Sequence, residues 1–187
     1  MFIDLTLKVT PQMIEKAFIN EKKSVYGHIG THFDVMDKCF PLEYIKRKGV
    51  VFDVSGIQND EIGSEDIDLS KVDRGMFVAF HTGFIEQVGY GEEKYFKQHP
   101  QLMNELIDKL VEKRISLIGI DFAGLRRGKE HTPKDAYLAD KGIFVVENLC
   151  NLNEVLKKKT DNFFIANTYP INYSEMTGLP CRVVAEI

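Results

Sequence analysis

The feature that most constrains the fold is an alternation of short apolar runs with segments of helical periodicity over the 187 residues. Runs rich in β-branched and aromatic residues predict strands, and they lie at Phe2–Val9, Val50–Val54, Met76–Phe80, Ile115–Ile120, Ile143–Val146, Phe163–Ala166 and Arg182–Ala185. Helices are predicted at about Pro11–Asn20, Leu42–Lys48, Glu92–Gln98, Gln101–Lys113, Pro133–Lys141 and Asn151–Lys158. Strands interleaved with helices predict an α/β domain, with either a mixed sheet or a partly closed barrel flanked by helices.

Composition narrows the class of protein. No linker or internal repeat divides the chain, so we expect residues 1–187 to form a single domain. A net charge of -4 gives no basic surface for nucleic acid. The absence of an apolar run of about 18 residues and of a leader-like start predicts a cytoplasmic protein that does not insert into membranes. Three widely spaced cysteines fit neither a disulfide framework nor a zinc ribbon.

The segment Val25–Val35, VYGHIGTHFDV, carries the clearest chemical signal. On an extended chain His28, His32 and Asp34 share one side, because successive side chains alternate between faces. Imidazole nitrogens and carboxylate oxygens suit zinc, manganese or iron(II). A straight strand would separate His28 from His32 by about 13 Å, so a bend at Gly30 is needed to bring both to one ion.

A carboxylate at the end of a buried strand strengthens the metal hypothesis. Glu147 directly follows the apolar run Ile143–Val146, and carboxylates are seldom buried unless they are paired or bind a metal. The alternative is that the two histidines are surface or hydrogen-bonded core residues, since the H-x-x-x-H spacing is common by chance.

Several motifs in order resemble the cyclase family, which includes bacterial kynurenine formamidases and isatin hydrolase. The segment HIGTHFD resembles the family signature H-x-G-T-H-x-D-x-P-x-H, and GIFVVENLCNL resembles its G-I-x-I-x-E-N-L-x-N-L stretch. Further similar segments are Ile3–Thr6, His81–Phe84, Gly119–Asp121 and Gly178–Ala185. The resemblance implies a metal-dependent hydrolase that cleaves the C–N bond of a small amide, on a cyclase-type β/β/α fold that is usually a homo-oligomer.

Carried over by position, the resemblance makes His28, His32 and Asp34 metal ligands, with Glu147 reaching the metal centre from the later strand. Two positions depart from the family pattern: Lys38 stands at the signature's third histidine, and Asp135 at a later histidine twelve residues before the glutamate. Both of these histidines would hold a second metal.

The two departures predict one divalent ion, zinc or manganese, rather than two. Lys38 would pair with Asp135 and take roughly the place and charge of the second ion. The alternative is that Lys38 points to solvent and Asp135 lies exposed in the first turn of a helix.

Other polar residues have less defined roles. His81 is a candidate hydrogen-bond donor or proton shuttle, because imidazole titrates near neutrality, and Glu147 could be a general base instead of a ligand. His131 is expected at the surface, although its loop could reach over the site. The arginines of the loop at 123–133 could recognise an acidic substrate, or could simply be solvated charge.

Two functions from different classes remain open at this point. The first is an enzyme, a metal-dependent amidohydrolase whose activated water attacks a linear or cyclic amide. The second is a catalytically inactive family member that binds a small molecule or a metal, which the loss of two ligand positions would favour.

Overall fold

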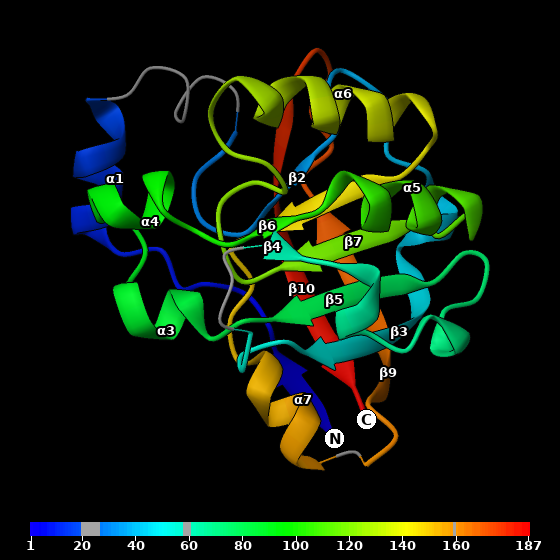
Figure 1. The fold of residues 1–187 in the computed structure, drawn as a ribbon. Helices are drawn as coiled ribbons and strands as arrows, with labels where there is room; N and C mark the ends of the chain where they lie inside the picture. Colours follow the sequence, from blue (N-terminus) through cyan, green and yellow to red (C-terminus); the bar gives the residue numbers. More distant parts are fainter. Residues whose placement is uncertain (20–26, 58–60, 159) are drawn as a thin grey trace.

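The computed structural model describes residues 1–19, 27–57, 61–158 and 160–187 (Figure 1). Its strands are β1 Phe2–Asp4, β2 His32–Asp34, β3 Lys46–Asp53, β4 Glu61–Ile62, β5 Phe77–His81, β6 Gln101–Leu102, β7 Leu117–Ile120, β8 Phe144–Glu147, β9 Phe163–Pro170 and β10 Gly178–Glu186. Its α-helices are α1 Pro11–Phe18, α3 Phe84–Val88, α4 Glu93–Lys97, α5 Asn104–Glu112, α6 His131–Asp140 and α7 Leu152–Lys158.

The main sheet closes on itself. Its strands follow the order β1-β10-β2-β8-β7-β5-β3-β9, and an additional pairing of β9 with β10 joins the ends into a mixed barrel, with β1 attached to β10. The strands β3, β5, β7 and β8 are parallel neighbours, whereas β2, β9 and β10 pair antiparallel. The predicted α/β class is therefore confirmed, and the barrel is closed rather than partly closed.

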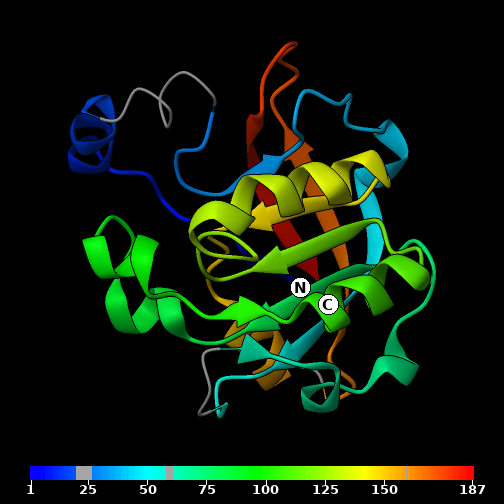
Figure 2. The same cartoon turned by 45° about the horizontal axis from the view of Figure 1, so that its top comes forward.

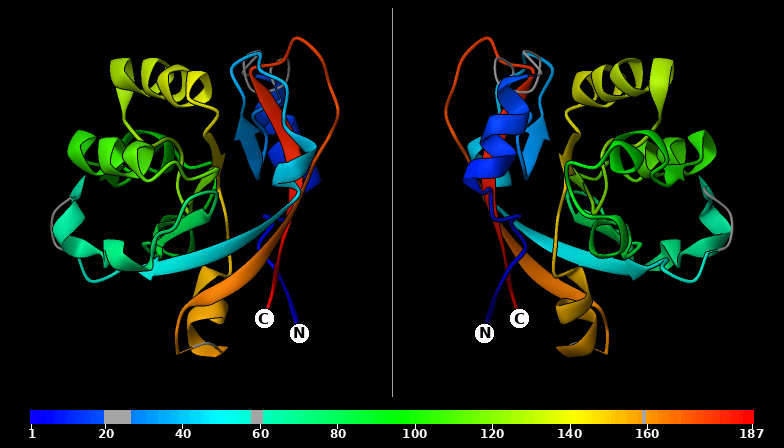
Figure 3. Two further views of the ribbon diagram at one scale, coloured as in Figure 1. Left: turned by 90° about the vertical axis from the view of Figure 1, so that its right-hand side faces the viewer. Right: turned by 90° about the vertical axis from the view of Figure 1, so that its left-hand side faces the viewer.

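Alternation of side chains along the parallel strands builds two cores. Val51, Phe77 and Leu117 face the barrel interior together with Phe33 of β2. Their neighbours Val50, Val78 and Ile118 face outward, where apolar residues of α5 and α6 cover them. Figure 3 shows these two helices on one side of the strands. Leu152 and Val155 of α7 belong to the interior core, and α7 lies at one end of the barrel (Figure 1).

The shorter helices α1, α3 and α4 lie along one edge of the domain (Figures 1 and 2). Buried Tyr95 and Ile85 form a small third core there, with Ala123. None of the helices among the described residues has both the length and the apolar character needed to cross a membrane. The three cysteines are free thiols.

Most predicted elements form, but three helical predictions need correction. The predicted helix Leu42–Lys48 is wrong beyond Tyr44, because Lys46, Arg47 and Lys48 open β3 and pair with β9. The predicted helix at Gln101 starts instead at Asn104, after the short strand β6. The end of the predicted helix at Asn20, like Val25 and Tyr26 of the histidine segment, lies outside the described residues.

Candidate metal centre

Strand register brings together two motifs that lie over 100 residues apart. In the antiparallel pair of β2 and β8, His32 lies directly opposite Glu147, and Phe33 lies opposite Val146. Phe33 and Val146 point into the barrel. Side chains alternate on both strands, so His32, Asp34 and Glu147 share the outer face, next to α6. All three are almost completely buried.

The predicted histidine cluster forms at this position. His28 Nδ1 lies 2.9 Å from His32 Nε2 and 3.0 Å from Asp34 Oδ1, and His32 Nε2 lies 3.5 Å from the same oxygen. Metal bonds of about 2.0–2.1 Å separate neighbouring ligand atoms of a tetrahedral site by roughly 3.3 Å. The three atoms are therefore spaced as ligands of one ion, with a fourth position open.

Gly30 supplies the bend that the sequence required. Its φ of +66° lies in the left-handed region, and a Cβ at this residue would come within 2.6 Å of Val9 Cγ2. A side chain is disfavoured on both counts. The turn shortens the path from His28 to His32, which brings their ring nitrogens into contact.

Hydrogen bonds fix the orientation of both rings. His32 Nδ1 lies 2.9 Å from the Gly30 carbonyl oxygen, which leaves Nε2 without a proton when the ring is neutral. Asn148 donates to the same carbonyl and accepts from the hydroxyl of Tyr95. His28 Nε2 lies 3.0 Å from Thr177 Oγ1. Metal-binding histidines generally have such a partner on the second nitrogen.

Sequence reasoning missed the third histidine of the cluster. His131, expected at the surface, is the first residue of α6, and its Nε2 lies 3.1 Å from Glu147 Oε1 and 3.1 Å from Asp135 Oδ2. The predicted helix began at Pro133, so the spacing of His131 and Asp135, one helical turn apart on the same face, was not considered. That i, i+4 spacing was the available signal.

The expected ion pair between Lys38 and Asp135 is not formed. Lys38 Nζ lies 2.7 Å from Asp140 Oδ1, at the solvent-exposed side of α6. Asp135 is 3% exposed and contacts His131, so the alternative of an exposed Asp135 is also wrong. The reason is that the last part of α6, not its middle, approaches the loop that follows β2.

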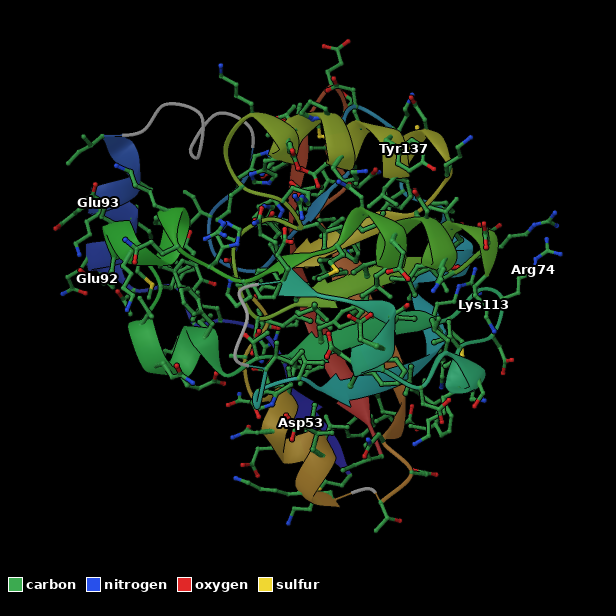
Figure 4. The ribbon with its side chains drawn as sticks, viewed as in Figure 1. Asp53, Arg74, Glu92, Glu93, Lys113 and Tyr137 are labelled. Carbon is green, nitrogen blue, oxygen red and sulfur yellow. The ribbon has the colours of Figure 1, made fainter. Side chains whose placement is uncertain are left out.

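His81 lies apart from this cluster. It ends β5, and its Nδ1 is 3.2 Å from Asp53 Oδ1. Figure 4 shows Asp53 at the lower end of the domain, far from the labelled Tyr137 of α6. The ring also belongs to a second group of potential metal ligands with Glu86 and Asp121, but both oxygens of Asp121 accept hydrogen bonds from Thr82 and Gly83.

The arginines of the 123–133 loop differ in their surroundings. Arg126 pairs with Glu61 and Glu130, which neutralises it locally. Arg127 lines a cavity of about 460 Å³ together with Lys94, Gln87 and Phe84. The part of this loop that could meet an anion is therefore Arg127.

The cluster has a strongly negative field. Burial alone would lower the pKa of His32, but the hydrogen bond to Asp34 and the charges of Asp34 and Glu147 raise it to about 9. Burial likewise opposes ionised Asp34, yet contacts with His28 and His32 hold the pKa of this carboxyl well below its usual range. Burial, followed by the charge of Asp34, raises the pKa of Asp135 to about 7.

The pKa of His131 rises in the same field. Burial would lower it, but the contacts with Asp135 and Glu147 raise it to about 11. A site that holds protons this firmly on its imidazoles is one that attracts cations, because the same carboxylates stabilise a proton or a metal ion at that point.

Comparisons with known proteins agree with this architecture. The Cyclase family model matches residues 3–125. Comparison with the curated proteins found no match. A structure described as a potential metal-dependent hydrolase with cyclase activity is 23% identical, with a TM-score of 0.75 over 99% of this chain and 96% of the other.

Two further solved structures share the fold. A predicted metal-dependent hydrolase from Bacillus stearothermophilus is 20% identical, with a TM-score of 0.72 over 99% of this chain and 97% of the other. Isatin hydrolase A from Labrenzia aggregata, bound to benzyl benzoate, is 20% identical, with a TM-score of 0.72 over 99% and 93%. The family model covers well over half of the sequence, and this chain belongs to the Cyclase family.

Proposed function

We propose that this protein is a metal-dependent hydrolase that cleaves the C–N bond of a small linear or cyclic amide. The observation that carries the proposal is the convergence of His28 Nδ1, His32 Nε2 and Asp34 Oδ1 at 2.9–3.5 Å from one another. Similar solved structures that are named as metal-dependent hydrolases and isatin hydrolases support the same reaction class.

The donor set suits a divalent ion such as zinc or manganese, held by His28, His32 and Asp34. When bound, such an ion acidifies water and polarises the amide carbonyl. Gly30 and Asn148 hold the His32 ring in the orientation that presents Nε2, and Thr177 does the same for His28. The protein thus supplies a preorganised set of ligands with one side left open.

Glu147 is the residue best placed to move protons. Its Oε2 lies 3.6 Å from His32 Nε2, at the edge of the ligand group. Amide hydrolysis forms a bond from the water oxygen to the carbonyl carbon and breaks the C–N bond, and the departing nitrogen takes up a proton. Glu147 can accept the proton of the water and return it to that nitrogen. The role of His81 as a proton shuttle stays a prediction.

The alternative function, binding without hydrolysis, rested on the loss of two family histidines. His131 weakens that argument, because it brings an imidazole to Glu147 from a different position in the sequence. Homo-oligomer formation and a cytoplasmic location stay predictions.

Metal analysis and an activity screen test the proposed function. The purified protein, loaded with Zn²⁺ or Mn²⁺, would be assayed with formylated anilines, isatin and simple lactams. We expect turnover by the wild type and by Lys38→Met, whose ammonium lies in an exposed pair. His32→Ala should lose both the ion and the activity. A fully loaded protein that hydrolyses none of the amides would favour the binding protein.

A further inference from the structure

A second group of ligands lies beside the first, on the α6 side. His131 Nε2 is 3.1 Å from Glu147 Oε1 and 3.1 Å from Asp135 Oδ2. Donor atoms of Asp34, His131 and Glu147 all lie within 4.8 Å of one another. No single motif of the sequence contains this group, since its members come from β2, α6 and β8.

Two buried oxygens at this place have no partner. Within the described part of the chain, Asp34 Oδ2 and Asp135 Oδ1 accept no hydrogen bond, although these residues are only 2% and 3% exposed. An unpaired oxygen of a buried carboxylate is costly. Both oxygens would be satisfied by a cation between them.

The two carboxylates shared by the groups are oriented as bridges. Asp34 directs Oδ1 to His28 and His32, which leaves Oδ2 for the other side. Glu147 has Oε2 near His32 and Oε1 near His131. Each carboxylate therefore offers one oxygen to each group, as in sites that hold two ions about 3.5–4 Å apart.

A protonated His131 would satisfy this group less well than a metal ion. One Nε2–H cannot point at Asp135 and Glu147 at the same time, although both oxygens lie at the same distance from it. It would also leave Asp34 Oδ2 unpaired. A divalent ion can bind several oxygens and an imidazole nitrogen simultaneously.

We propose that Asp34 Oδ2, His131 Nε2, Asp135 and Glu147 Oε1 hold a second divalent cation. His131 replaces the missing family histidines from a new position, so the expectation of a single ion is revised to two. The carboxylate-rich ligand set suits Mn²⁺. The inference rests on the proposed function, because the second ion shares Asp34 and Glu147 with the first.

Metal stoichiometry tests the second site without reference to activity. Protein stripped with chelator would be dialysed against MnCl₂ and its bound Mn²⁺ counted. We expect two ions in the wild type and one in His131→Gln and in Asp135→Asn. Asp140→Asn is the matched control, because it makes the same change in α6 at an exposed carboxylate outside the cluster, and it should keep two ions.

Electron paramagnetic resonance gives an independent readout. Two Mn²⁺ ions bridged by carboxylates should show a coupled signal, which His131→Gln should convert to that of an isolated ion. Thermal unfolding of each variant checks that it is folded. One ion in the wild type, lost in His28→Ala but unchanged in His131→Gln, would overturn the second site and leave the proposed function intact. No ion in the wild type would overturn both.

Discussion

Replacing Gly30 by alanine tests whether the bend in the histidine segment builds the metal centre. The left-handed backbone costs an ordinary residue about 1–2 kcal/mol, and the lower entropy of the unfolded chain returns roughly 0.4–1 kcal/mol. The added methyl group would lie 2.6 Å from Val9 Cγ2, which adds a clash. Val9 is 37% exposed and can move, so we expect a total loss of about 1–2 kcal/mol in the free energy of unfolding.

The same substitution should weaken metal binding more than it weakens the fold. The Gly30 carbonyl orients His32 through Nδ1, and the loss of such a partner typically lowers metal affinity about 10–100-fold. Urea unfolding gives the stability, and titration with Mn²⁺ gives the affinity. The double variant Gly30→Ala/Val9→Ala should recover the part of the loss due to the clash.

Gly56→Ala is the matched control for Gly30→Ala. A Cβ at Gly56 meets no atom within 4 Å, and its φ lies outside the left-handed region. Its stability should stay within about 0.5 kcal/mol of the wild type or rise slightly. The reasoning would be refuted if Gly30→Ala matched this control in stability and bound Mn²⁺ with unchanged affinity.

Three further predictions concern the surroundings of the centre. Tyr95→Phe removes the buried hydroxyl that donates to Asn148 and should cost about 1–3 kcal/mol in urea unfolding; a loss below 0.5 kcal/mol, on the order of error, would contradict it. Lys38→Met breaks only the exposed pair with Asp140, so calorimetry should show a change below about 1 kcal/mol and the metal count should not change. In the metal-free protein, the pKa of His32 is raised from 6.5 to about 9, so the folded chain holds more protons than the unfolded chain in that window. The urea midpoint should therefore fall as pH rises through it, less steeply in His32→Gln, and a rising midpoint would disprove the assignment.

Local sequence patterns were sufficient for the main strands and for the first ligand group. The alternation of side chains on an extended chain put His32 and Asp34 on one face, and a glycine between the two histidines predicted the bend that Gly30 makes. Glu147 could be placed near a metal because a carboxylate ended a buried strand. Each of these inferences depends on residues within a few positions of one another.

The tertiary structure decided the rest of the site. The pairing of β2 with β8 set His32 opposite Glu147, and the packing of α6 on the barrel brought His131 into the centre and left Lys38 at Asp140. These contacts depend on where a helix begins and on how it packs against a strand, and local periodicity does not specify either. The sequence by itself determined which residues could bind a metal, whereas the closed barrel decided which of them meet.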